Sequence, residues 1–116
     1  MKKFALILAC ALFAAPLANA GPVSGSGSKV DYAFGGGDTT YQIAFVGGEA
    51  TGVFVNGDGS SVLDVAVYDE AGNLVAGNLG NAAGCTVIWM PASTGVYTVV
   101  VINEGSNLNL FTIDIV

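Results

Sequence analysis

The side chains best suited to bind a metal ion are oxygen donors around one Gly-rich segment. Asn56 and Asp58 lie in this segment, and Asp64 and Asp69 flank the apolar run that follows. Carboxylate and amide oxygens are ligands that calcium prefers, and oxygen-only ligands favour such a hard cation over zinc or copper. The four residues therefore form a candidate calcium site, expected to be weak because no single segment supplies a full ligand set.

The same residues also suit turns. Asn and Asp side chains hydrogen-bond to nearby backbone groups, which makes them common in turns without any metal. The spacing does not match an EF-hand loop, because its first and last ligand positions would fall on Phe54 and Val65. Turn formation therefore stays open as the alternative interpretation of the four residues.

Catalytic chemistry has little support in this sequence. Nucleophilic catalysis needs a base within hydrogen-bond reach of Ser, Thr or Cys, but the chain has no His. Asp64 and Asp69 come closest to the carboxylate pair of a glycosidase, yet residues 21–116 leave little room for a substrate cleft. We therefore predict no catalytic residues, no enzyme activity and no cofactor beyond the candidate calcium ion.

Cys85 lies in an alternating run with Val87 and Trp89, which predicts that all three share one strand face. A buried thiol and a core Trp are the expected roles, since free Cys is among the most buried residue types. A disulfide between two chains through Cys85 remains the alternative. The alternative role for Trp89, together with the tyrosines, is a carbohydrate or peptide platform. Tyr32, Phe34 and Tyr68 are less constrained by this pattern, and we expect them to be exposed.

The first 20 residues have the pattern of a signal peptide. A basic start precedes an apolar stretch and an Ala-x-Ala motif ending at Ala20, where we expect cleavage. An uncleaved anchor and lipidation at Cys10 are the alternatives. Export places the protein in the periplasm or the extracellular medium, and residues 21–28, rich in Gly and Ser, are expected to form a flexible lead.

Charge restricts the partners of the exported chain. Lys2 and Lys3 leave with the signal peptide, so Lys29 alone faces nine Asp and Glu residues, a net side-chain charge of −8. Nucleic acid and anionic membrane surfaces are excluded as partners, since both are bound through Lys and Arg. The exported chain also lacks an apolar run long enough to insert into a membrane.

Short apolar runs with a period of two, separated by Gly, Asn and Asp, indicate β-strands joined by turns. We predict a single domain over residues 29–116: an all-β, antiparallel, jelly-roll-like β-sandwich of seven or eight strands. The run Val96–Ile102 is apolar on both faces, as in a central strand or a contact surface. The predicted strands are 41–45, 53–55, 63–68, 74–75, 85–90, 96–102 and 110–116.

The ordered set of these motifs resembles the bacterial pre-peptidase C-terminal domain, a jelly-roll β-sandwich related to the collagen-binding modules of secreted collagenases. The motifs are Gly47-Gly48-Glu49-Ala50, Gly57-Asp58-Gly59, Leu63-Asp64-Val65, Gly72-Asn73-Leu74-Val75, Gly95-Val96-Tyr97 and Asn109-x-Phe111-x-Ile113. The resemblance implies a secreted, non-catalytic module that binds a protein, glycan or cell-surface polymer, or stabilises a larger protein. The alternative is a structural surface subunit that self-assembles through sheet edges.

Overall fold

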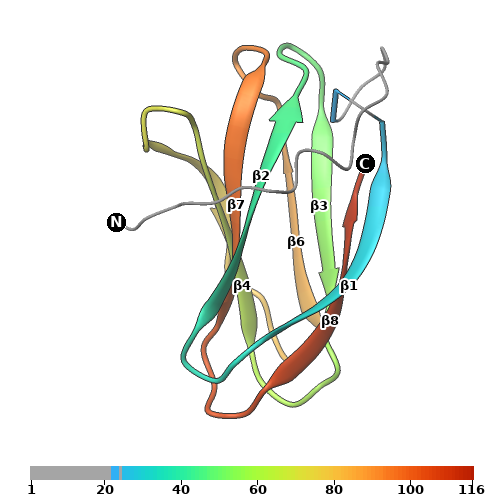
Figure 1. Cartoon of the computed structure of the whole chain (residues 1–116), viewed down its shortest axis with the longest axis vertical. Coiled ribbons are helices and arrows are strands. Elements are labelled where there is room, and N and C mark those ends of the chain that lie inside the picture. Colours follow the sequence, from blue (N-terminus) through green and yellow to red (C-terminus); the bar gives the residue numbers. More distant parts are fainter. Residues whose placement is uncertain (1–21, 24) are drawn as a thin grey trace.

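The protein is an all-β sandwich. The computed structural model describes residues 22–23 and 25–116, and the predicted signal peptide with its cleavage site lies outside this part. The eight strands are β1 (Gly27–Ala33), β2 (Asp38–Phe45), β3 (Thr51–Asn56), β4 (Leu63–Tyr68), β5 (Leu74–Asn78), β6 (Gly84–Trp89), β7 (Gly95–Asn103) and β8 (Asn109–Ile115). They form two four-stranded sheets, β1-β8-β3-β6 and β2-β7-β4-β5, which Figure 1 shows as two layers. All strand pairs are antiparallel, so the predicted fold class is confirmed.

Consecutive strands alternate between the two sheets, except for the β4–β5 hairpin. The loops therefore gather at two ends of the sandwich. Loops 34–37, 57–62, 79–83 and 104–108 lie at one end, called here the β3–β4 end, and the remaining loops lie at the other. This topology decides which polar residues can meet.

The core lies between the sheets, where alternate residues of each strand point inward. On β7, Val99 and Val101 are fully buried, whereas Val100 and Ile102 lie half-buried on the outer face. Burial of such aliphatic side chains supplies the main stabilising free energy of the domain. Within the strands, the other large, fully buried apolar side chains are Phe45, Val53, Leu63, Val65 and Val67.

An aromatic cluster closes the core at the end opposite the β3–β4 end. The ring centroid of Phe45 lies 4.9 Å from that of Trp89 and 5.9 Å from that of Tyr97, in edge-to-face geometry. Cys85 and Val87 are buried as expected, but Trp89 is only partly buried. Trp89 is the last residue of β6, so the sandwich covers only part of its ring.

The folded part starts earlier than the sequence indicates. β1 begins at Gly27, inside the segment expected to be a flexible lead, and Ser28 lies opposite Asp114 of β8. Pro22 is fully buried and forms a bridge with Phe45, and the Val23 amide donates to the Ala44 carbonyl at 2.8 Å. Backbone pairing needs no apolar side chain, which is why a Gly- and Ser-rich composition does not reveal it.

No helix within the described ranges has the length and apolar character that a membrane crossing needs.

Candidate functional site

The Asp58 side chain links the β3–β4 loop to strand β8 through hydrogen bonds. One carboxylate oxygen accepts the Ser60 amide at 2.8 Å and the other accepts the Leu110 amide at 2.9 Å. The Leu110 bond is the main reason why the pKa of Asp58 lies below its usual value. Both oxygens therefore have protein partners, and the turn interpretation accounts for this residue.

Asp64 is a buried carboxylate at the start of β4, with 6% of its surface exposed. It accepts the Gly80 amide at 2.9 Å. Glu104, in the β7–β8 loop, neighbours this carboxylate, and the hydrogen bond that protonated Glu104 makes to Asp64, together with the charge of Asp64, raises the pKa of Glu104. Glu104 is the partner that the sequence pattern did not reveal, because it lies 40 positions away along the chain.

The four predicted calcium ligands do not converge. Asp69 follows β4 at the end opposite Asp64, about 16 Å away at the usual rise per strand residue. Its carboxylate accepts the amides of Ala71 and Asn73, and the Asn73 bond lowers its pKa. Within residues 22–23 and 25–116, no three Asp, Glu, His or Cys side chains group closely enough to hold a metal ion.

Calcium binding nevertheless stays a prediction. Thermal melting at fixed ionic strength, with calcium, magnesium or a chelator, tests it directly. A rise in Tm specific to calcium that Asp58→Asn or Asp64→Asn removes would support the prediction. The same Tm in all three conditions would contradict the prediction. Asn56, Asp58, Asp64 and Asp69 would then have structural roles only.

The Asp64–Glu104 pair predicts that mild acid stabilises the protein. The raised pKa of Glu104 means that the folded state favours its neutral form, so its contribution is full below the ordinary value of 4.5 and is lost as pH rises through the folded pKa. The lowered pKa values of Asp58 and Asp69 act oppositely, since their contribution is lost as pH falls below the ordinary 3.8. Melting curves should therefore show a Tm that rises as pH falls from 7 toward 4.5 and decreases below 3.8.

Glu104→Gln should raise Tm at pH 7 and remove most of the rise on acidification. Glu49→Gln deletes the same charge from an exposed turn and serves as the matched control, which should keep the pH dependence. A flat Tm between pH 7 and pH 4.5 in the unmodified protein would contradict the assignment.

The Cys85 thiol is 6% exposed and donates to the Asn78 carbonyl at 3.3 Å. Burial raises its pKa, and a protonated, buried thiol reacts slowly. We expect a maleimide reagent to label Cys85 only after denaturation, as followed by intact mass. Rapid labelling of the native protein would contradict its burial and revive a disulfide between two chains.

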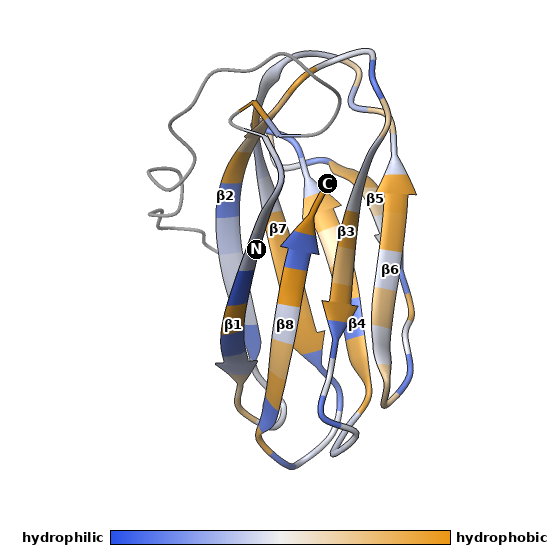
Figure 2. Ribbon diagram, turned by 90° about the vertical axis from the view of Figure 1, so that its right-hand side faces the viewer, coloured by the Kyte–Doolittle hydropathy of each residue, from blue (hydrophilic) through white to orange (hydrophobic). Residues whose placement is uncertain are grey.

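The outer face of sheet β1-β8-β3-β6 is the candidate binding surface. Alternation on β1 is reversed there, since apolar residues point outward and Lys29 and Asp31 point inward toward Tyr41 of the other sheet. Figure 2 looks onto this face. We call the exposed group on it the apolar patch; its members and exposed fractions are Val30 (74%), Tyr32 (47%), Phe34 (67%) and Leu110 (52%).

The apolar patch is held together by strand register. Tyr32 lies directly opposite Leu110, and the rings of Tyr32 and Phe34 meet edge to face at 5.4 Å between centroids. An exposed, contiguous apolar group of this kind marks an interaction site more often than isolated exposed residues do. The expectation that Tyr32 and Phe34 are exposed is confirmed, whereas Tyr68 is half-buried.

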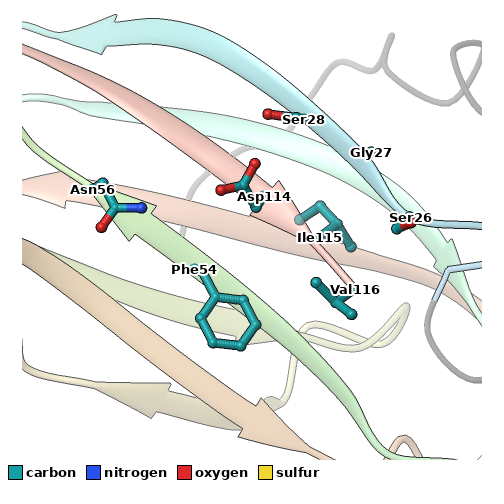
Figure 3. Close-up of a pocket in the computed structure, with 8 residues that line it drawn as sticks. All are labelled: Ser26, Gly27, Ser28, Phe54, Asn56, Asp114, Ile115 and Val116. Carbon is teal, nitrogen blue, oxygen red and sulfur yellow. The ribbon is translucent and has the colours of Figure 1, made fainter.

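A shallow groove of about 630 Å³ lies on the same face, and its lining residue Ser28 is two positions before Val30 of the apolar patch on β1. Figure 3 shows its lining, in which Phe54 of β3 and Asp114 of β8 are the aromatic and the charged member. The two residues are directly opposite in the ladder. The sequence carries a signal for one of them, since the position of Phe54 between two core valines indicates an aromatic side chain on the outer face. The remaining lining residues are Ser26, Gly27, Ser28, Asn56, Ile115 and Val116.

Comparison with known proteins identifies the fold. No protein-family model matches the sequence, and no curated protein matches it. Among solved structures, the chain is similar to the pre-peptidase C-terminal domain of collagenase from Bacillus anthracis, with a TM-score of 0.60 and 11% sequence identity over 78% of this chain and 89% of that one. At this identity the likeness concerns the fold, and the resemblance seen in the sequence motifs is confirmed at that level: the protein has the β-sandwich fold of a pre-peptidase C-terminal domain.

Proposed function

We propose that the protein is an exported, non-catalytic binding module whose ligand lies across the outer face of sheet β1-β8-β3-β6. The ligand is an extracellular or periplasmic protein, a glycan or a cell-surface polymer. The observation that supports this function best is the apolar patch and the groove on one face of the same sheet. A domain of this size that leaves Phe34 67% and Val30 74% exposed retains apolar area that a partner could bury.

The chemistry of the chain supports a non-catalytic role. The chain has no His, so the common nucleophile–base pairs cannot form. Asp64 and Asp69, the closest approach to a catalytic carboxylate pair, lie at opposite ends of β4. The fold is similar to that of a collagenase domain, and the name of this domain refers to a C-terminal position. Such a position agrees with an accessory role.

The alternative is a structural subunit that self-assembles through sheet edges. The charged residues of edge strand β1 argue against it. The Tyr41 hydroxyl donates to Asp31 at 2.7 Å, and the Lys29 ammonium lies 3.8 Å from the same carboxylate. Inward-pointing charges on an edge strand discourage pairing with another edge. Size-exclusion chromatography at several concentrations tests the point: a monomer supports the binding module, and growth of large species supports the structural subunit.

Binding itself is tested with a panel of purified cell-wall polymers and matrix proteins, including collagen because the similar domain comes from a collagenase. The variant Tyr32→Ser/Phe34→Ser should lose binding while its circular dichroism and Tm stay unchanged. Leu79→Ser is the matched control, since Leu79 is 81% exposed in the β5–β6 loop, away from the apolar patch. Equal loss in the control, or full binding by the patch variant, would contradict the proposed surface.

A further inference from the structure

We propose that the groove over Phe54 and Asp114 binds a Lys or Arg side chain from an extended segment of a partner protein. This inference rests on the proposed function and specifies its ligand class. It is carried by three features of the described residues: a carboxylate and an aromatic ring at opposite positions of one ladder, the charge balance of the chain, and the order of outward-facing residues along β1.

Asp114 and Phe54 occupy opposite positions in the ladder. Asp114 lies on the central strand β8, directly opposite Phe54 of β3 on one side and Ser28 of β1 on the other. In antiparallel sheets such opposite residues share one face and lie about 5 Å apart at Cβ. A long cationic side chain suits a carboxylate and an aromatic ring on one face, because the carboxylate neutralises its charge while the ring quadrupole attracts it.

The absence of a side chain at Gly52 lets the ring of Phe54 lie against the sheet instead of projecting from it. A Cβ added at Gly52 would lie 2.7 Å from Cε1 and 3.1 Å from Cζ of Phe54. The ring therefore lies down over the bare backbone of Gly52, along its own strand, and any larger residue at position 52 would displace it. This packing limits the ring's motion and makes it part of the floor of the groove.

The charge balance of the chain favours a positively charged ligand. All nine carboxylates of the chain lie in its described part, and they face a single Lys and no Arg or His. The ammonium of Lys29 is already engaged, 3.8 Å from Asp31 and 5.8 Å from the ring centroid of Tyr41. The protein therefore attracts cationic partners and repels polyanions such as acidic glycans.

The order of outward-facing residues along β1 favours an extended ligand. Outward-facing residues along β1 run from Ser28 in the groove to Val30 and Tyr32 in the apolar patch. Residues two apart in a strand are about 6.6 Å apart, so an extended peptide lying along β1 repeats at the same interval. A basic residue over Asp114 places an apolar residue four positions along the peptide over Tyr32 and Leu110.

The test uses the ¹⁵N-labelled protein and three probes: a blocked peptide containing Arg-Ser-Thr-Ser-Leu, the same peptide with Glu for Arg, and a neutral cello-oligosaccharide. Addition of the Arg peptide should shift the amide signals of Ser28, Phe54 and Asp114, with weaker binding at higher salt. Asp114→Asn should weaken the affinity about fivefold, and Phe54→Leu, which keeps the apolar volume, about threefold. The Glu peptide should bind far more weakly.

Glu49→Gln is the matched control for net charge, since Glu49 is an exposed carboxylate in the β2–β3 turn. It should change the affinity for the Arg peptide less than about twofold. Equal weakening by Glu49→Gln and Asp114→Asn would overturn the inference, because attraction would then come from net charge alone. Shifts at the groove with the oligosaccharide and none with the Arg peptide would refute the ligand class and leave the proposed function standing. Shifts confined to sheet β2-β7-β4-β5 would overturn both.

Discussion

Phe45→Ala is expected to lower the free energy of unfolding by about 3–5 kcal/mol, the usual range for removal of a fully buried aromatic side chain. Phe45 has no exposed surface, and its ring meets those of Trp89 and Tyr97 edge to face. Alanine would leave a cavity at the end of the sandwich that the paired strands cannot close. Urea unfolding followed by Trp89 fluorescence measures the loss.

Phe34→Ala is the matched control, because it removes the same atoms from a residue that is 67% exposed. It should change the unfolding free energy by less than about 0.5 kcal/mol. If Phe45→Ala does not fold, Phe45→Leu keeps most of the volume and should cost about 1–2 kcal/mol. A similar effect of alanine at positions 34 and 45 would contradict the position of the core.

Asn109→Ala is expected to cost about 2–4 kcal/mol, since it leaves several buried polar groups unpaired. The side-chain oxygen of Asn109 accepts the Asp58 amide at 3.0 Å, and its nitrogen donates to the Ser61 carbonyl at 2.9 Å and to the Ser61 hydroxyl at 3.2 Å. Asn109 is fully buried, so water cannot readily replace these bonds. The residue thus ties the β3–β4 loop to the first residue of β8.

Asn107→Ala is the control for this prediction. Asn107 is exposed, and its side chain makes one long contact, 3.5 Å to the Ser60 carbonyl. Its replacement should shift the urea midpoint only slightly. A loss below about 1 kcal/mol for Asn109→Ala, or equal losses at positions 107 and 109, would show that the buried hydrogen bonds are not what holds the loop.

The candidate site illustrates the limits of linear spacing. Asp64 and Asp69 are close in sequence but are separated by the length of β4. Asp64 instead meets Glu104, and Asp58 meets the Leu110 amide, because loops from distant parts of the chain share the β3–β4 end. No local pattern encodes these contacts, since they depend on which strands neighbour each other.

Strand β1 shows a second limit. Its alternation places Val30 and Tyr32 on the solvent side and Lys29 and Asp31 toward the other sheet, the reverse of the usual pattern. A prediction that places the apolar residues of each strand in the core would turn the wrong face of β1 inward. Register with β8 fixes it instead, and the same register creates the apolar patch.

The sequence by itself determined the fold class, the positions of seven strands and the burial of Cys85, because alternation and turn residues are local properties that follow directly from strand geometry. The tertiary structure decided the strand order, the orientation of β1, the separation of Asp64 from Asp69 and the pairing of Phe54 with Asp114. These features depend on contacts between residues far apart in the chain. Cross-strand pairing and sheet stacking select them, and short-range propensity does not contain that information.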